Sequence, residues 1–404
     1  MKKTILFVLT VCMIGFINCN AQKVKSGAKV EPLNKVIDQS LAFSVKQYKL
    51  MSEVMLPKTD SLPRTIDKTG HLTTSDSRWW CSGFYPGCLW YLYEGTKDPM
   101  MKKYAKVMTA RVEREKFTTS NHDVGFMINC SFGNGLRITN EKSYKDVLLT
   151  AAKSLSTRFN PKVGLIQSWG ANAKWKYPVI IDNMMNLELL MNAFNISHDS
   201  SFYKIAVSHA DLTMKNHYRS DYSCYHVVSY NPETGEPMIK QTHQGAFNES
   251  AWARGQSWGL YGYVMMYRET KLDRYLQQAK HIAAFLLNHP NLPKDKIPYW
   301  DFNAPSIPDA QRDASAGALM ASALIELSQY VDKQLAKKYL NVAEIEIRSL
   351  SSPAYRAALG ENGDFIIKHN VGSFPHNSEV DVPLTYADYY YLEAMLRYKK
   401  LKIH

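Results

Sequence analysis

The hydrophobic positions of the chain form two alternating helical patterns. One pattern is amphipathic, with a turn, a tyrosine and an alanine-dotted helix, and it recurs around Tyr104, Tyr144, Tyr203, Tyr275 and Tyr339. The other pattern is apolar on every side, and one such segment precedes each amphipathic helix. Amphipathic helices usually lie at a protein surface, whereas helices that are apolar all round are buried. The pattern therefore predicts an inner layer of apolar helices covered by an outer layer of amphipathic ones.

An opening helix near 33–52 and a closing helix in YADYYYLEAMLRYK bring the expected total to about twelve helices. Six hairpins that close on themselves make an all-α (α/α)6 barrel, and an open solenoid of helix pairs is the competing geometry. The uneven repeat spacing favours the closed barrel. Strand signals are confined to two places, a β-hairpin near 222–243 with its turn at Asn231–Gly235 and the segment GDFIIKHNVGS.

The N-terminus resembles a secretory signal peptide. Two lysines precede an apolar run, and the segment NCNAQ offers a small-residue cleavage site after Ala21. Cys19 raises the alternative of a lipid-anchored terminus, but Asn18 is bulkier than that processing site normally accepts. We therefore expect a signal peptide over residues 1–21 and a single barrel domain over residues 22–404, exported to the periplasm.

The composition restricts the classes of partner. The formal net charge of +12 is scattered over the chain rather than gathered in a nucleic-acid-binding segment. No later apolar stretch is long enough to span a membrane, and a basic exported protein is compatible with an anionic substrate. Cysteines outside the signal peptide lack paired metal spacing, and His226 and His243 have no third ligand at helical spacing. We expect neither a metal nor a cofactor.

Polar residues stand where the predicted inner helices begin. In a barrel of hairpins all inner helices run in the same direction, so their N-termini open onto one face. The residues at these positions are His122, Asp123, Asp182, Trp252, Arg254, Trp258, Arg312, Asp313, Asp381 and Asp388. The sequence therefore predicts a funnel that contains acids, an arginine and aromatic side chains.

An aspartate at a helix start is usually an N-cap worth about 1 kcal/mol, and we assign this role to Asp313 and Asp388. Asp123 and Asp182 differ, because each lies beside apolar residues at the mouth of adjacent inner helices. Two nearby carboxylates shift each other's pKa, which leaves one protonated and able to act as an acid. Arg254 has two open interpretations, a partner for a buried acid or a fork that holds an anionic ligand.

Four tryptophans lie near loops or inner-helix ends, namely Trp80, Trp169, Trp252 and Trp258. They are compatible with an ordinary hydrophobic core. Sugar rings also stack on such faces, and this number near one mouth exceeds what a core needs. The aromatic residues therefore favour a carbohydrate ligand.

Several of these motifs together resemble glycoside hydrolase family 88, the unsaturated glucuronyl hydrolases. They are WCSGFYPGCLWYLYE, NHDVGFM, VIIDNMMNLELL, THQGAFNESAWARGQSWGLYGY, RDASAGALMASALIEL and ADYYYLEAML, in the family's order over nearly all of the mature chain. The resemblance implies an (α/α)6 barrel that acts on oligosaccharides released by polysaccharide lyases. These substrates carry a 4,5-unsaturated uronic acid at the non-reducing end, which the family removes by adding water across the double bond.

By the same resemblance, Asp182 is the general acid that protonates C4 and then helps to deprotonate the water. Asp123 is the second catalytic carboxylate. The residues implied to bind the substrate are Trp80, His122, Trp169, His226, Thr242, His243, Gln244, Trp252, Arg254, Trp258 and, in a second sugar site, Ser373, His376 and Ser378. The loop HNVGSFPHNSEVDV lacks the serine and lysine arrangement that some members use around sulfate, so sulfate preference stays open.

Three other functions compete with this one. An unsaturated rhamnogalacturonyl hydrolase of pectin breakdown would share the fold and the acid, but THQG and WARGQSW favour the glucuronyl enzyme. A non-catalytic glycan-binding protein would carry a clear anchor cysteine and no paired acids. A sugar epimerase on the same barrel would use two histidines as bases and would lack a signal peptide.

Overall fold

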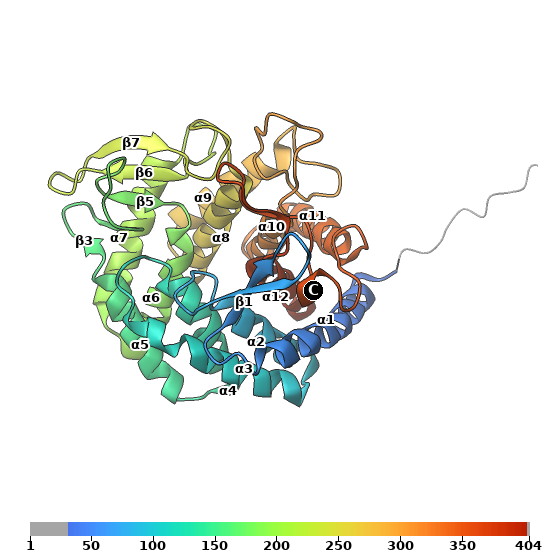
Figure 1. Ribbon diagram of the computed structural model, residues 1–404. Coiled ribbons are helices and arrows are strands. Elements are labelled where there is room, and N and C mark those ends of the chain that lie inside the picture. The colour runs from blue at the N-terminus through green and yellow to red at the C-terminus, as the bar shows by residue number, and fades with distance from the viewer. Residues whose placement is uncertain (1–30, 402–404) are drawn as a thin grey trace, which may run out of the picture. The chain divides into compact units, whose positions relative to one another are not determined.

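Six inner helices form a closed ring in the computed structural model, which describes residues 31–401 (Figure 1). The inner helices are α2 (Phe84–Thr96), the π-helix η2 (Gly125–Gly133) continued by α4 (Asn134–Thr139), α6 (Asn183–Ser197), α8 (Ala253–Thr270), α10 (Ala314–Leu327) and α12 (Thr385–Lys400). Each packs against the next, and α12 packs against α2. This last contact closes the ring, so the predicted (α/α)6 barrel is confirmed and the open solenoid is excluded.

The outer layer covers this ring with amphipathic helices. Its members are α1 (Leu33–Met55), α3 (Pro99–Val112), α5 (Ser143–Ser156), α7 (Ser200–His217), α9 (Asp273–Asn288) and α11 (Lys333–Ser351). Inner helix α10 is buried at every position, whereas outer helix α9 buries one face around Tyr275, Ala279 and Ile282. The short 3-10 helices are η1 (Glu113–Phe117), η3 (Ser328–Tyr330) and η4 (Asn362–Asp364). The two predicted layers are therefore present.

Four small antiparallel sheets decorate the barrel. They consist of β1 (Leu62–Ile66) with β2 (Leu72–Ser75), β3 (Phe159–Asn160) with β4 (Leu165–Ile166), β5 (Pro178–Ile180) with β6 (Val227–Tyr230) and β7 (Pro237–Gln241), and β8 (Asn370–Ser373) with β9 (Ser378–Val382). The predicted hairpin is β6–β7, and Gly235 in its turn has a positive φ of 78°. The prediction of strands in only two segments was wrong, because β3 to β5 span only two or three residues and β1 and β2 do not alternate regularly between buried and exposed positions.

The described residues from Leu33 onward form one compact unit. The predicted signal peptide, including Cys19, lies outside the described residues, so its limits stay a prediction. Within the described part of the chain, no helix is long and apolar enough to cross a membrane. The cysteines of this part, Cys81, Cys88, Cys130 and Cys224, are free and buried.

The three-stranded sheet fixes the start of inner helix α6. Strand β5 ends at Ile180, and the Ile181 backbone N–H donates to the His226 carbonyl beside β6. The chain then passes directly through Asp182 into α6. The sheet therefore holds the backbone of Asp182 at the mouth of the barrel.

Candidate active site

Asp182 occupies the N-cap position of α6 without capping it. Its side chain accepts no hydrogen bond from the first turn, and its Oδ2 atom is buried without a hydrogen-bond partner among the described residues. The residue is only 7% exposed. An aspartate at this position usually stabilises the helix by accepting a hydrogen bond from a backbone N–H group. The Asp182 carboxyl does not do so. It is available for chemistry instead.

Asp123 lies at the start of the neighbouring inner helix, where the backbone forms the π-helix η2. This π-helix packs closely on α6, because a Cβ added to Gly125 would lie 2.6 Å from the Asn186 Cα atom. Asn186 accepts a hydrogen bond from the Phe126 N–H at 2.9 Å. π-helical turns are rare and frequently occur at functional sites. The close contact sets the positions of the two helix starts that carry Asp123 and Asp182.

Both carboxyls have strongly raised pKa values. Burial, then the charge of Asp182, raises the pKa of Asp123 to about 7, against a smaller opposing effect of Arg158. Burial also raises the pKa of Asp182 to about 7, while Arg254 and the Trp258 indole act in the opposite direction. Because the charge of Asp182 acts on Asp123, the two carboxyls belong to one site. A carboxyl that keeps its proton near neutral pH is suited to general acid catalysis.

A neutral histidine stands beside each acid. His122 Nε2 lies 3.4 Å from Asp123 Oδ1, and His226 Nε2 lies 3.5 Å from Asp182 Oδ2. Burial lowers the pKa of His122 to about 3 despite the opposing effect of Asn183. Burial, with the charges of His243 and Arg254, also lowers the pKa of His226. Near neutral pH neither imidazole is charged, so neither one stabilises an ionised acid by a full positive charge.

Three of the predicted binding residues form a buried layer behind the acids. Trp252, Arg254 and Trp258 are each 2% exposed or less. Trp252 packs against the His226 ring at 4.5 Å and under the Arg254 guanidinium at 4.6 Å. Arg254 donates to Asp313 at 2.7 Å and to the carbonyls of Val371 and Gly372. This environment supports the first of the two interpretations of Arg254, the buried ion pair.

The aromatic residues of the rim differ in exposure: Trp80 and Trp169 are half-buried, His243 is exposed and Trp175 is buried. Trp169, Trp175 and His243 form a cluster with ring centroids 5.5 to 5.9 Å apart. His376 from the β8–β9 loop joins it, with its ring centroid 4.4 Å from that of His243. Trp80 lies on the other side of the mouth, against Phe126 and Tyr386. These rings come from separate loops around one opening.

Hydrogen bonds connect the loops that carry the remaining predicted residues. Thr242 Oγ1 accepts from the Gly245 N–H at 2.7 Å, and Gln244 Nε2 donates to the Gly372 carbonyl at 2.9 Å. Ser373 Oγ lies 2.7 Å from His376 Nδ1. The structure thus brings the β7–α8 loop and the β8–β9 hairpin together at the same mouth. The binding roles of Thr242, Gln244 and Ser373 stay predictions.

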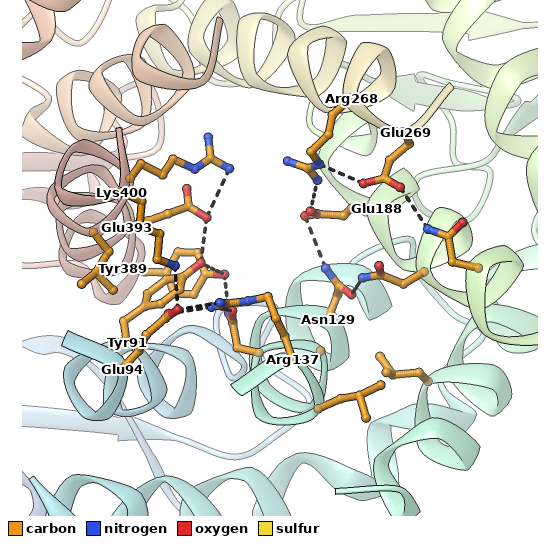
Figure 2. Close-up of a pocket in the computed structure, with 18 of the residues that line it drawn as sticks. Tyr91, Glu94, Asn129, Arg137, Glu188, Arg268, Glu269, Tyr389, Glu393 and Lys400 are labelled. Atoms are coloured by element: carbon orange, nitrogen blue, oxygen red, sulfur yellow. Dashed lines mark hydrogen bonds and ion pairs between the residues drawn. The ribbon is translucent and has the colours of Figure 1, made fainter. Parts of the chain in front are cut away.

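A cavity of about 480 Å³ lies at the opposite end of the barrel, where the inner helices end (Figure 2). Its charged side chains are paired with one another. Arg137 donates to both Glu94 oxygens at 2.7 and 2.8 Å, and Arg268 contacts Glu188 and Glu326. Burial alone would raise the pKa of Glu94, but Arg137 and Lys400 lower it to about 2. Glu94 is therefore held ionised, whereas burial raises the pKa of Glu188 against the opposing charge of Arg268.

The chain matches the model of Glycosyl Hydrolase Family 88 over residues 57–400. It belongs to glycoside hydrolase family 88. An unsaturated glucuronyl hydrolase of Formosa agariphila is 47% identical over 327 residues, which cover 80% of this chain and 81% of that protein. The crystal structure of a family 88 unsaturated glucuronyl hydrolase specific for heparin has a TM-score of 0.88 and 45% identity, covering 92% of this chain and 99% of that one.

A more distant family 88 enzyme has been solved with a ligand. It is a mutant unsaturated glucuronyl hydrolase of Streptococcus agalactiae complexed with dGlcA-GalNAc6S. Its TM-score is 0.78 at 27% identity, with 91% of this chain and 92% of that one covered. The comparisons confirm the predicted family, the barrel fold and the activity of an unsaturated glucuronyl hydrolase. The family 88 chain is therefore a hydrolase rather than a non-catalytic glycan-binding protein.

Two N-cap predictions for this family 88 chain had different outcomes. Asp313 caps α10 by accepting from the Ser315 N–H, as predicted. The prediction for Asp388 was wrong, because this residue lies inside α12, whose N-cap is Leu384. Its buried carboxyl accepts from the backbone N–H groups of Ile366 and Ile367 and from the Tyr48 hydroxyl. Asp388 therefore anchors a distant loop to α12.

The sequence also left three site residues unidentified. Asn183 and Arg158 act on His122 and Asp123, and Trp175 belongs to the rim cluster. Asn183 follows Asp182 directly, so its place at the N-terminus of the helix was a usable signal. Arg158 lies in the loop after α5 and gave no such signal.

Proposed function

We propose that Asp182 and Asp123 together hydrate the double bond of a 4,5-unsaturated uronic acid at the non-reducing end of an oligosaccharide. Asp182 donates a proton to C4, positive charge develops at C5, and a water molecule attacks that carbon. Asp182 then accepts a proton from the water, so the chemical step returns the proton that Asp182 donated. The hemiketal at C5 opens, and the bond to the neighbouring sugar breaks.

One observation carries this proposal. Two carboxyls lie at adjacent inner-helix starts without serving as helix caps, and burial raises the pKa of each to about 7. An ordinary aspartate is ionised at neutral pH and cannot protonate carbon. Burial keeps a proton on this pair of carboxyls near neutral pH. The second carboxyl, Asp123, supports the positive charge that develops on the ring.

The substrate we propose is an oligosaccharide released from a glycosaminoglycan by a lyase. The N-termini of η2, α6 and α8 point to the same mouth, and their positive ends favour the anionic uronate. Both Arg254 Nη atoms are bonded, to Asp313 and to the carbonyls of Val371 and Gly372, so its positive charge would act on the uronate without direct contact. The Trp169, Trp175 and His243 rings would contact the sugar beyond the scissile bond.

A panel of lyase-derived disaccharides tests the function. The panel holds heparin, chondroitin and hyaluronan products, sulfated and unsulfated, together with an unsaturated rhamnogalacturonan disaccharide. Turnover removes the absorbance of the double bond. We expect loss of absorbance with glycosaminoglycan products. Faster turnover of the rhamnogalacturonan product would instead favour the pectin-degrading alternative.

The proposed location is the periplasm, following export by the signal peptide of residues 1–21. Cell fractionation with an antibody to the full chain tests this location. We expect the protein in the periplasmic fraction with its N-terminus at residue 22. A protein that starts with a lipid-modified Cys19 would overturn soluble export.

A further inference from the structure

The hydrogen bonds around His226 determine which of its nitrogens carries the proton. Nδ1 accepts from two backbone amides, the His243 N–H and the Gln244 N–H, each at 3.1 Å. A nitrogen that accepts two hydrogen bonds carries no proton of its own. Since the buried imidazole is neutral, the proton must be on Nε2. This Nε2–H faces Asp182 Oδ2 at 3.5 Å.

Against burial, the polar groups other than Asp123 that act on Asp182 favour its ionised form. His226 offers the Nε2–H, and the Trp258 indole N–H and the Arg254 guanidinium both lower the pKa of this carboxyl. Asp123 is the second acid of the site. Two negative charges side by side are unfavourable, so one of the two acids keeps a proton. A carboxylate surrounded by donors is stabilised as an acceptor.

His122 has the opposite arrangement because of its neighbour Asn183. The Asn183 amide nitrogen donates to the Ile166 carbonyl at 2.9 Å, so the amide oxygen is the end that remains for His122. Asn183 Oδ1 and His122 Nδ1 are both buried, and neither has a hydrogen-bond partner of good geometry among the described residues. The action of Asn183 on His122 favours a proton on the ring, as expected when the amide oxygen accepts from Nδ1.

The backbone of Ile166 fixes this orientation from the other side. Its N–H donates to His209 Nδ1 at 3.0 Å, and its carbonyl accepts from Asn183. Both His209 and Asn183 are fully buried, so water does not compete for these bonds. The Asn183 amide therefore has one orientation, with its oxygen facing the imidazole.

With its proton on Nδ1, neutral His122 presents a lone pair on Nε2 to Asp123 Oδ1 at 3.4 Å. A carboxylate oxygen in that position would face another acceptor, which is unfavourable in a buried site. A protonated carboxyl would instead donate to Nε2. His226 therefore favours an ionised Asp182, whereas His122 favours a protonated Asp123.

We propose that in the substrate-free enzyme the proton shared by the two acids resides on Asp123, and that Asp182 is ionised. The charged or titratable groups around them agree with this placement. Repulsion between the two carboxylates disfavours ionising both and acts on each alike, so their neighbours decide: Arg254 favours the ionised form of Asp182, and Arg158 opposes the proton on Asp123. Asp123 is then the proton reservoir of the site.

This inference rests on the proposed function and adds a loading step to it. Asp182 must gain a proton before it protonates C4, so substrate binding moves the proton from the Asp123 carboxyl to the Asp182 carboxylate. The transfer leaves Asp123 as a carboxylate, which is the form able to support positive charge at C5. The acid is therefore loaded only in the complex, and no proton is taken from solvent in that step.

Neutron diffraction on substrate-free crystals of the deuterated wild-type enzyme tests the placement directly. The crystals are held at a pH below about 7, where the site retains its proton. We expect deuterium on the Asp123 carboxyl, on His226 Nε2 and on His122 Nδ1. Deuterium on the Asp182 carboxyl or on His122 Nε2 would overturn the proposal. Turnover is not used, so failure of the proposed reaction would leave this result unaffected.

Nitrogen-15 NMR of labelled histidine provides the solution test, with two internal references. His209 Nδ1 accepts from an amide, whereas His217 Nδ1 lies 3.3 Å from the Tyr225 carbonyl and so carries the proton. We expect His226 to give the tautomer pattern of His209, and His122 that of His217. His122→Asn and His226→Asn assign the signals by their loss. A His122 pattern that matches His209 would contradict the inference, and the neutron result stands even if either variant fails to fold.

Discussion

Arg254 and Asp313 form a buried ion pair, with Nη1 and Oδ2 2.7 Å apart and neither side chain more than 2% exposed. The same guanidinium donates to the carbonyls of Val371 and Gly372 in β8. Asp313 in turn caps α10. One arginine on α8 therefore connects the start of α10 with a strand of the active-site mouth.

Removing this arginine should destabilise the barrel. Arg254→Met leaves the Asp313 carboxylate buried without its partner, and the free energy of unfolding should fall by about 3–5 kcal/mol. The measurement is urea denaturation followed by circular dichroism. Arg348→Met is the control, because the Arg348–Glu344 pair lies on the surface of α11 and is worth about 1 kcal/mol or less. Equal losses in the two variants would contradict a special role for Arg254.

Replacing the proposed acid should remove turnover and preserve binding. Asp182→Asn keeps the shape of the side chain but cannot donate the proton, so kcat should fall by a factor on the order of 10²–10⁴. Calorimetry should still detect binding of the unsaturated disaccharide. Asp199→Asn is the control, since Asp199 caps α7 and asparagine caps helices equally well. Parental turnover by Asp182→Asn would remove this residue from the mechanism.

Activity should depend on one proton held near neutral pH. Since the pKa values of Asp123 and Asp182 are both raised to about 7, kcat/KM should be level in acid and fall about tenfold per pH unit above that value. The measurement is a pH profile of disaccharide turnover. If Asp123→Asn retains measurable activity, the pH at which its kcat/KM begins to fall should differ from that of the wild type. A kcat/KM that rises through pH 7 would exclude a general acid whose proton is retained because the carboxyl is buried.

The same raised pKa values predict how stability changes with pH. Between the ordinary aspartate pKa and about 7 the folded protein holds protons that the unfolded chain has released. The free energy of unfolding should therefore fall as pH rises through this interval, by up to about 1.4 kcal/mol per unit for each group. Denaturation at several pH values measures the slope. Asp123→Asn should flatten it, since Asp123 holds the shared proton in the free enzyme, and an unchanged slope would mean that Asp123 is ionised throughout this interval.

The rim should determine affinity rather than the chemical step. Trp169→Ala removes one ring of the Trp169, Trp175 and His243 cluster, and the loss of a stacking partner costs about 0.5–1.5 kcal/mol. KM should rise several-fold while kcat changes little. Phe117→Ala is the control, because Phe117 is 66% exposed and contacts only Lys116 among ring interactions. A fall in kcat alone would assign Trp169 to the catalytic step.

The closed ring was predictable because helix periodicity is a local property. Apolar segments and amphipathic segments alternate along the chain, and α10 and α9 show the burial that this alternation implies. The places of Asp123 and Asp182 at inner-helix starts were also predictable, since both interrupt apolar surroundings there, and their catalytic roles stay predictions. Asp388 was misassigned because its partners, Ile366, Ile367 and Tyr48, lie far from it in sequence. No local pattern encodes such contacts.

The orientation of the histidines was likewise hidden from the sequence. The tautomer of His226 depends on two loop amides, and that of His122 on an asparagine fixed by the Ile166 backbone. These are relations between side chains and peptide groups, which residue identity alone does not specify. The short strands that supply the peptide groups were also the part of the fold that the pattern missed.

The contact between Gly125 and Asn186 has a consequence for how this barrel can change. The close backbone contact between η2 and α6 positions the two acids, and this contact does not involve the rim loops. Exchanging the loops around Trp169, His243 or His376 would alter which sugar is held and leave the acids in place. New specificities can therefore arise by replacing the rim, while any side chain larger than hydrogen at position 125 would require η2 or α6 to shift.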